Sequence, residues 1–341
     1  MRYLQQIVEG RDLSVSEAEA LLGEIFKGAT DAQIGALLIA LKTKGESASE
    51  IAGLARAMRS SAIRISPRVS GPLVDTCGTG GDGTNTINVS TAAAIVAASC
   101  GAFVAKHGNY AVSSDCGSAN VLSELGVEVA LPPERVCERI ETLGIGFLLA
   151  PLFHPSMKRV AFIRRELAMR TVFNILGPLT NPAGARFQVM GVYDPNLCER
   201  LAASLQILGA ERAMVVHGSG LDEITNTGPT AISELNGGGL RSYTVVPQDF
   251  GYARAALEEI RGGSPEENAR KLVEILSGAK NPGRDIVAMN SGAALYVSGI
   301  ADTLFDGAKM AEEAIDSGRS LETLKRMVRS GGSPQKLERF L

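Results

Sequence analysis

From residue 73 onward, the sequence alternates between short apolar runs of the β type and stretches with a helical period. The β-type runs cover residues 73–76, 102–106, 146–150, 188–193 and 213–218, and the helical stretches between them include 91–99, 133–143 and 195–208. This alternation is typical of an α/β domain, because each helix returns the chain so that the next strand can pair in parallel. The sequence therefore predicts a central, mostly parallel sheet, with ligands bound at the carboxyl ends of its strands.

The first 65 residues lack this alternation and predict a small all-helical domain. Capping boxes begin at Ser14, Thr30 and Ser47, each with Glu or Gln three residues later. Apolar residues then recur at i, i+3, i+4 and i+7, so each helix has one face to bury. Residues 66–72, SPRVSGP, contain two prolines and a glycine. They predict a hinge between residues 1–65 and an α/β domain over 73–341.

Composition argues against several classes of function. The formal net charge is −3, so no overall basic character favours nucleic acid. No apolar run reaches the ~18 residues of a membrane span, and the first residues lack the apolar stretch of a signal peptide. The five cysteines form no CxxC pair, which favours a reducing compartment. We therefore expect a cytoplasmic protein with neither a nucleic-acid nor a membrane partner.

Residues 75–94, DTCGTGGDGTNTINVSTAAA, are the most informative segment. A predicted strand runs through Gly78, Gly80, Gly81 and Gly83 into an Ala-rich helix that begins near Ser90 and Thr91. Glycine lets the backbone take a positive φ and approach a ligand closely, and the N-terminus of a helix favours an anion. The spacing is that of neither a P-loop nor a dinucleotide-binding loop. The segment predicts an anion-binding loop, although a tight turn capped by Ser90 would also use these glycines.

Residues 105–126 also place polar groups between a strand and a helix. The segment contains Lys106, His107, Gly108, Asn109, Ser113, Ser114 and Ser118. Lys106 offers a point charge for a phosphate, and the serines and backbone amides offer neutral donors. The alternative interpretation is a capped loop with a surface lysine.

Residues 152–167 bring four cations close to a histidine. Lys158, Arg159, Arg164 and Arg165 follow His154 within this segment. A solvated helix face is the usual explanation of such a run, so the pattern alone leaves an anion-binding role open.

Residues 215–230, VVHGSGLDEITNTGPT, present the adjacent acids Asp222 and Glu223 in a loop after a predicted strand. Oxygen ligands of this kind suit magnesium, which keeps several waters and often bridges to a phosphate. The alternative is a turn with two solvated acids. Two carboxylates would repel a nearby diphosphate unless a cation lay between the carboxylates and the diphosphate. The Gly-rich loop and the acidic pair together therefore predict a divalent metal site.

Four long motifs resemble those of the anthranilate phosphoribosyltransferase family. They are DTCGTGGDGTNTINVSTAAA, KHGN-AVSS with GSANVLSELG, HPSMKRVAFIRRELAMRTVFNILGPLTNPAG and HGSGLDEITNTGPT, and the resemblance covers nearly the whole chain. The resemblance implies a nucleoside phosphorylase-like fold, in which the helical domain also takes helices from about 160–187. It also implies transfer of the phosphoribosyl group from phosphoribosyl diphosphate (PRPP) to anthranilate in tryptophan biosynthesis. The partner would be a second copy of the chain, joined through the helical domains, and the cofactor would be Mg²⁺, two ions per subunit.

The resemblance further implies roles for particular residues. PRPP would be held by Gly78, Gly81, Asp82, Thr86, Asn88, Val89, Ser90, Thr91, Lys106, His107, Gly108, Asn109, Ser113, Ser114 and Ser118. Anthranilate would contact Gly78, Asn109, Arg164, His107, His154 and Pro178, and the metal ligands would be Ser90, Asp222 and Glu223. The sequence predicts no general base, because the aromatic amine of anthranilate is a neutral nucleophile.

Two positions depart from the family pattern. Tyr110 stands where Arg is common, which removes a cation beside the predicted phosphate loop, and Asn120 stands where Asp is common. Two alternative functions are also open. A nucleoside phosphorylase of the same fold would use free phosphate without magnesium, and a non-catalytic nucleic-acid-binding relative should have a basic surface.

Overall fold

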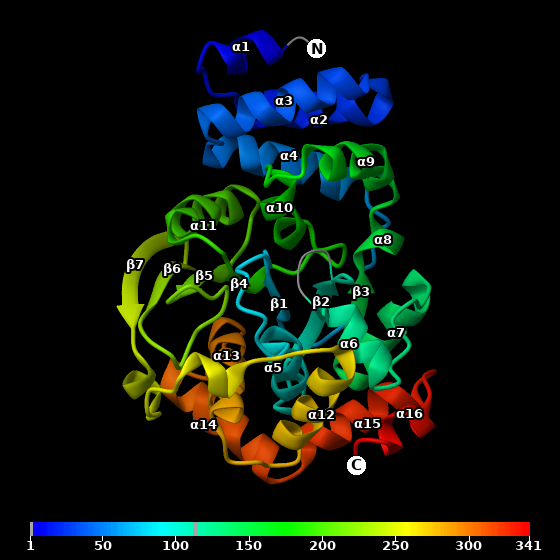
Figure 1. Cartoon of the computed structure of the whole chain (residues 1–341), viewed down its shortest axis with the longest axis vertical. Coiled ribbons are helices and arrows are strands. Elements are labelled where there is room, and N and C mark those ends of the chain that lie inside the picture. The colour runs from blue at the N-terminus through cyan, green and yellow to red at the C-terminus, as the bar shows by residue number, and fades with distance from the viewer. Residues whose placement is uncertain (1–2, 112–114) are drawn as a thin grey trace.

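The computed structural model describes residues 3–111 and 115–341, and it comprises a helical body and a larger α/β body (Figure 1). The helical body begins with α1 (Leu4–Val8), α2 (Val15–Gly28), α3 (Asp31–Lys44) and α4 (Ala48–Ser61). Short helices from mid-chain return to it: α8 (Ala150–Phe153), η1 (Pro155–Met157), α9 (Lys158–Leu167), α10 (Phe173–Leu176) and η2 (Gly177–Thr180). Apolar side chains of α9 and α10 share one buried cluster with those of α2, α3 and α4. Segments far apart in sequence therefore build the helical body.

The predicted capping boxes begin α2, α3 and α4. At Ser14, Thr30 and Ser47 the side chain accepts from the amide three residues later, and the returning Glu or Gln side chain accepts from the cap amide. These reciprocal bonds satisfy backbone donors that a helix start leaves without a partner. The three predicted helix starts are confirmed.

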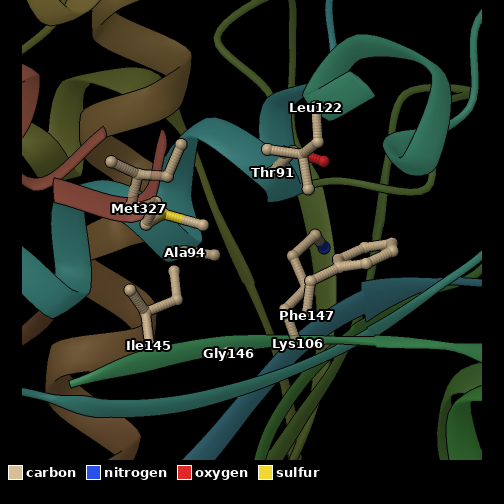
Figure 2. Close-up of a pocket in the computed structure, with 9 residues that line it drawn as sticks. Thr91, Ala94, Lys106, Leu122, Ile145, Gly146, Phe147 and Met327 are labelled. Atoms are coloured by element: carbon tan, nitrogen blue, oxygen red, sulfur yellow. The ribbon is translucent and has the colours of Figure 1, made fainter. Parts of the chain in front are cut away.

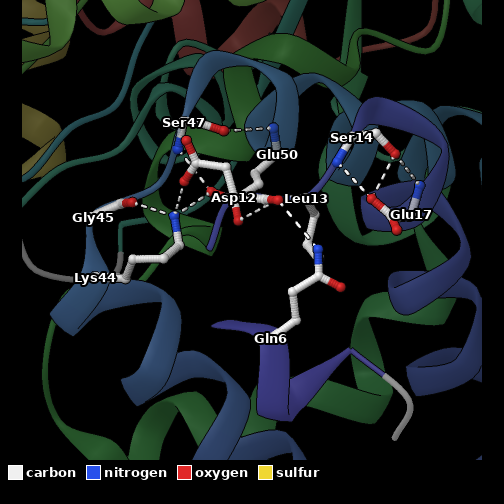
Figure 3. Close-up of polar contacts among 9 residues, drawn as sticks. All are labelled: Gln6, Asp12, Leu13, Ser14, Glu17, Lys44, Gly45, Ser47 and Glu50. Carbon is white, nitrogen blue, oxygen red and sulfur yellow. Dashed lines mark hydrogen bonds and ion pairs between the residues drawn. The ribbon is translucent and has the colours of Figure 1, made fainter. Parts of the chain in front are cut away.

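A buried carboxylate ties the turns of the helical body together (Figure 3). Glu50 is 0% exposed and accepts from the amides of Leu13 (3.1 Å) and Ser47 (2.8 Å). The ammonium of Lys44 donates to the same carboxylate at 2.8 Å. A buried charge needs such partners, since an unpaired one costs several kcal/mol. The network links the α1–α2 segment to the turn between α3 and α4.

Seven strands form one sheet at the centre of the α/β body. They are β1 (Leu73–Gly78), β2 (Phe103–Gly108), β3 (Ile145–Leu149), β4 (Phe187–Gly191), β5 (Arg212–Gly218), β6 (Thr230–Asn236) and β7 (Gly239–Val245). Their order is β3-β2-β1-β4-β5-β6-β7, and the first five are parallel to one another. The predicted fold class, a helical domain with a mostly parallel sheet, is confirmed.

The antiparallel hairpin of β6 and β7 is an addition that the sequence pattern did not predict. β7 lies at the edge of the sheet and most of its side chains are exposed, so it carries little apolar alternation. Gly237 and Gly238 connect the two strands with φ of 58° and 80°. Two positive φ angles in a two-residue loop match the right-handed twist of the strands that flank it.

Helices cover both faces of the sheet (Figure 1). The helices of the α/β body are α5 (Val89–Ser99), α6 (Ser118–Glu124), α7 (Pro133–Leu143), η3 (Pro195–Leu197), α11 (Cys198–Ile207), η4 (Pro247–Phe250), η5 (Leu257–Ile260), α12 (Pro265–Leu276), α13 (Pro282–Val297), α14 (Leu304–Asp316), α15 (Arg319–Arg329) and α16 (Pro334–Glu338). Met214 and Val216 of β5 join the core with α5 and α13, whereas Ala213 and Val215 join the core with the helical body. This alternation follows from the two-residue period of a strand. Among the described residues, no helix is long and apolar enough to cross a membrane.

Candidate active site

A cleft of about 740 Å³ is lined by residues from the carboxyl ends of the central strands and by residues of the helical body. Every predicted site residue within the described ranges lines this cleft. These residues are Gly78, Gly81, Asp82, Thr86, Asn88, Val89, Ser90, Thr91, Lys106, His107, Gly108, Asn109, Ser118, His154, Arg164, Pro178, Asp222 and Glu223. Ser113 and Ser114 lie outside the described residues. Four segments that are distant in sequence therefore meet at one site.

Glycine is required at several positions of the loop between β1 and α5. Gly80, Gly81 and Gly83 have φ of 64°, 77° and 76°, where a side chain would cause strain. Gly78 is needed for a different reason, since an added Cβ would lie 2.3 Å from the carboxylate of Asp222. The loop can therefore lie directly against the acidic segment.

The loop presents backbone donors to the cleft. Within the described ranges, the amides of Gly81, Asp82 and Gly83 donate to no protein acceptor. The carboxylate of Asp82 shapes the turn by accepting from the amide (3.0 Å) and hydroxyl (2.8 Å) of Thr84. Successive amides in such a turn form a concavity that suits an anion.

Helix α5 begins one residue before the predicted cap. Its first residue is Val89, and Asn88 is the N-cap, without a side-chain bond to the helix. The alternative interpretation of Ser90 as the cap is therefore wrong. Ser90 lies in the first turn, where its amide donates to Glu223 at 3.1 Å and its hydroxyl accepts from Lys106 at 3.3 Å.

Lys106 is buried, so the interpretation as a surface lysine is also wrong. Its side chain is 3% exposed, and its ammonium donates to the carbonyl of Thr76 at 2.6 Å. Figure 2 shows its side chain rising beside the ring of Phe147. Burial lowers the pKa of Lys106, while the carboxylate of Asp75 acts to raise it. A cation held in this way presents its charge from the floor of the cleft.

The sheet itself opens beneath the cleft. Within the described residues, the last pair between β1 and β2 is Val74 with Val104, although both strands continue for four more residues beside their other neighbours. Beyond this pair, the carboxylate of Asp75 accepts from the amide of His107 at 3.2 Å. The ammonium of Lys106 bonds across the same gap. The separation of β1 from β2 is therefore stabilised by buried polar groups.

Acidic groups converge opposite the Gly-rich loop. The carboxylate of Asp222 accepts from the amide of Gly80 at 2.7 Å, and the Asp222 amide donates to Asp82 at 3.4 Å. Burial, with a contribution from the Asp82 charge, raises the pKa of Asp222 to about 7. Burial, followed by the Asp222 charge, raises the pKa of Glu223 well above its usual value. Acids that repel one another in this way would be stabilised by a cation.

The donor set suits a cation that keeps part of its shell as water. The described residues hold no cluster of three or more His, Cys, Asp or Glu side chains arranged to enclose a metal ion. Asp222, Glu223 and the hydroxyl of Ser90 would supply only some of the positions around an octahedral ion. Magnesium prefers this situation, because it completes its octahedron with water and substrate oxygens. The residues present therefore fit magnesium better than a metal bound wholly by the protein.

Two neutral imidazoles form another part of the cleft. The rings of His107 and His154 lie 5.2 Å apart between centroids and are buried. Burial lowers the pKa of His107 to about 3 and that of His154 to about 4, so both are uncharged at neutral pH. In the described part of the chain, Nε2 of His107 and both ring nitrogens of His154 make no hydrogen bond of ordinary geometry, although the backbone at Gly177 and at Thr180 lies near enough to act against the lowered pKa values. Beside Pro178, the two rings form a surface suited to a flat aromatic ring with polar substituents.

The cations of α9 have separate roles. Arg164 lines the cleft, its guanidinium lies 5.7 Å from the ring centroid of Phe173, and burial lowers its pKa. Arg159 instead pairs with Asp31 at 2.8 Å and so joins α9 to the start of α3 within the helical body. A solvated helix face therefore does not describe Arg164, whose cation is available to an anionic group in the cleft.

The two departures from the family pattern have different consequences. The side-chain oxygen of Asn120 accepts from the amides of Ala111 (2.8 Å) and Gly117 (3.1 Å). An aspartate oxygen could accept the same bonds, so the amide preserves this turn. Tyr110 lies at the rim of the cleft, 43% exposed, and supplies no cation there.

Other residues that line the cleft were missed by sequence reasoning. They include Asp115, Arg170, Phe173, Asn174, Tyr193 and Asn268. Tyr193 follows the carboxyl end of β4, so the position of strand ends could have indicated it. Asn268 comes from α12 and donates to Asn88 at 2.9 Å, and no local pattern marks that contact.

Comparison with known proteins shows that the chain has the two domains of a glycosyl transferase family. A family model described as the helical bundle domain of a glycosyl transferase family matches residues 1–62, and one described as the a/b domain matches residues 70–321. Curated relatives are more specific. The anthranilate phosphoribosyltransferase of Methanococcoides burtonii is 54% identical over 96% of this chain and 92% of its own, and that of Methanosarcina barkeri is 56% identical over 93% and 87%.

Solved structures agree with these relatives. The enzyme from Thermus thermophilus superposes with a TM-score of 0.92 at 44% identity, over 97% of this chain and 99% of its own. The enzyme from Saccharomyces cerevisiae in complex with PRPP and Mg superposes with a TM-score of 0.87 at 30% identity, over 96% of each chain. The chain belongs to the anthranilate phosphoribosyltransferase family and is therefore a transferase.

Proposed function

We propose that the protein transfers the 5-phosphoribosyl group of PRPP to the amine of anthranilate, and that this reaction takes place in the cleft. The products are N-(5-phosphoribosyl)anthranilate and pyrophosphate, and the reaction belongs to tryptophan biosynthesis. The observation that supports this most strongly is the division of the cleft. Free amides and an acidic pair lie on the α/β wall, whereas Arg164 and the neutral imidazole of His154 lie on the helical wall. The neutral imidazole of His107 faces His154 from the end of β2. A charged diphosphate and an aromatic acid need these two different environments.

On the α/β wall, Asp222, Glu223 and Ser90 would hold magnesium beside the diphosphate, and we propose two ions per subunit. Bound there, magnesium supplies positive charge to the leaving pyrophosphate, an effect worth several kcal/mol in comparable sites. The amides of the Gly-rich loop would donate to phosphate oxygens. Lys106 would add a fixed positive charge from below, because its position is set by Thr76 and Ser90.

On the opposite wall, Arg164 would pair with the carboxylate of anthranilate. His154 and Pro178 of this wall would contact its ring, and His107 would contact the ring from the end of β2 on the α/β side. The amide group of Asn109, which follows β2, would lie near its amine. The low pKa values of the two histidines keep them uncharged, so they do not compete with Arg164 for the carboxylate. The aromatic amine would therefore face the ribose carbon without a charged group between them.

The chemistry needs positioning more than proton transfer. We propose displacement at ribose C1 with oxocarbenium-like character, without a general base, because the attacking amine is neutral. Holding the amine and C1 near attack distance is the main contribution of the enzyme. Closure about residues 66–72 would exclude water, which otherwise competes as the nucleophile.

Assembly and location belong to the same proposal. We propose a homodimer joined through the helical bodies, where Val8 and Ile39 expose apolar side chains (69% and 37%). We also propose a cytoplasmic location, because all five cysteines are free thiols.

The test is the loss of anthranilate fluorescence when PRPP is added to the purified chain, with and without magnesium. We expect fluorescence loss that depends on both PRPP and magnesium. Phosphorolysis of nucleosides without magnesium, in place of this reaction, would instead indicate the phosphorylase alternative.

A further inference from the structure

Arg170 reaches from the helical body to the phosphate loop. It lies between α9 and α10, donates from Nη2 to the carbonyl of Gly81, and stacks over Tyr193 with 4.1 Å between its Cζ and the ring centroid. We propose that Arg170 is a positioning residue that clamps the Gly-rich loop in the conformation that binds the diphosphate. This inference rests on the proposed function of the cleft.

The geometry of one peptide group explains what the clamp would do. A trans peptide is planar, so its carbonyl and its N–H point in opposite directions. Because the Gly81 carbonyl points to Arg170, the N–H of Asp82 points to the other side, and it has no acceptor among the described residues. Gly81, with φ of 77°, has little conformational preference of its own. The loop therefore needs a contact from outside to hold this orientation.

The platform under Arg170 belongs to the same loop assembly. The amide of Tyr193 donates to the hydroxyl of Thr79 at 3.2 Å, and the amide of Thr79 donates to the carbonyl of Gly191 at 2.9 Å. The loop is thus fixed to the end of β4 at Thr79 and to the helical body at Gly81. Tyr193 contacts both attachments, since its backbone binds Thr79 and its ring supports Arg170.

The clamp joins the two walls of the cleft. Neighbouring α9 contacts α3, and α10 contacts α4, so the backbone around Arg170 is carried by the helical body. A change in the position of that body would change the support of the phosphate loop. Arginine suits this task better than lysine, because its planar group can stack on a ring while it donates in a fixed direction. Binding of the diphosphate is therefore expected to depend on a residue from the opposite wall.

The test compares Arg170→Met with the matched control Arg165→Met. Arg165 lies on α9, also places its guanidinium near an aromatic ring (5.8 Å from the centroid of Phe162), and does not line the cleft. We expect Arg170→Met to raise the KM for PRPP roughly tenfold to a hundredfold, from the loss of a charge-assisted hydrogen bond. The KM for anthranilate and the melting temperature should stay close to the wild-type values. The control should resemble the wild type in every measurement.

Arg170→Lys keeps the charge without the planar group and should raise the KM for PRPP by a smaller factor; it also carries the test if Arg170→Met does not fold. An unchanged KM for PRPP, equal rises in both KM values, or the same change in Arg165→Met would overturn the proposal. If the wild type does not transfer phosphoribosyl groups, the proposed function fails. The clamp is then tested by calorimetric binding of pyrophosphate with magnesium, which Arg170→Met should weaken and Arg165→Met should not.

Discussion

The two walls of the cleft offer different kinds of groups to a ligand. The α/β wall uses backbone amides, two adjacent acids and a buried lysine, all at the ends of strands or in the loops that follow them. The helical wall uses side chains of α8–α10 and the segments between them, including Arg164, Arg170 and Phe173. Recognition by backbone needs glycines at fixed places and leaves a local pattern in the sequence. Recognition by side chains depends on how distant helices pack, and it leaves a weaker pattern.

The walls also differ in charge. The acids of the α/β wall have raised pKa values and need a cation, whereas His154 of the helical wall has a lowered pKa and remains neutral. Burial causes both shifts, because it disfavours whichever form is charged. We propose from this difference that the diphosphate binds to one wall and the aromatic acid mainly to the other, and the following experiments can break or sharpen that proposal.

The largest effect is expected at the acidic pair. Asp222→Asn combined with Glu223→Gln should lower turnover by about a thousandfold or more, because the leaving pyrophosphate loses its metal. Initial rates measured over a range of magnesium concentrations will check this, with Glu258→Gln, an exposed acid outside the cleft, as the control. Near-normal rates with an unchanged magnesium response would contradict the metal assignment.

A smaller effect that is specific to one substrate is expected on the other wall. Arg164→Ala should raise the KM for anthranilate roughly thirtyfold, since a charge-assisted bond to the carboxylate is lost. The KM for PRPP should change by less than about twofold, as expected for a residue outside the diphosphate site. Steady-state kinetics with each substrate varied in turn will separate the two, and equal rises would argue against two distinct walls.

Metal affinity should depend on pH. A protonated acid cannot bind magnesium, and the pKa of Asp222 is raised to about 7. Competition by the Asp222 proton alone then weakens apparent magnesium binding about tenfold between pH 8 and pH 6, and the raised pKa of Glu223 adds to this loss. Magnesium titrations at these two pH values will measure the change. Identical affinities at both would show that Asp222 is already ionised at pH 6.

The smallest effect concerns stability. The pKa of His154 falls from 6.5 to about 4 on folding. Between these two pH values, the unfolded chain binds a proton at this residue and the folded chain does not. Stability from this residue is complete well above pH 6.5 and is lost as the pH falls toward 4, by ~1.4 kcal/mol at pH 5.5. Denaturant unfolding should show that His154→Gln loses less stability than the wild type over this range. Parallel losses in both proteins would contradict the assignment.

Much of the fold could be predicted from local patterns. The capping boxes at Ser14, Thr30 and Ser47 located three helix starts, and apolar runs located the five parallel strands. Strand β7 escaped prediction because an exposed edge strand buries too few side chains to show alternation. Strand β6 is largely buried on both faces, so its mixture of polar and apolar residues shows no alternation either. The start of α5 escaped by one residue, because Asn88 caps the helix without using its side chain.

In the candidate site, too, some features could be predicted from local sequence and others depend on tertiary packing. The Gly-rich loop and the Asp222–Glu223 pair could be predicted, since each lies in one short segment of unusual composition. The burial of Lys106 could not, because it depends on the separation of β1 from β2. The clamp formed by Arg170 could not either, because Gly81 and Tyr193 are brought to it only by the packing of the two bodies.

The most direct test is a calorimetric titration of PRPP into the wild type and into the Asp222→Asn, Glu223→Gln double variant, each with and without magnesium. We predict that magnesium tightens the binding of PRPP to the wild type and has little effect on the double variant. Equal tightening in both proteins would contradict the claim that these two acids hold the metal beside the diphosphate.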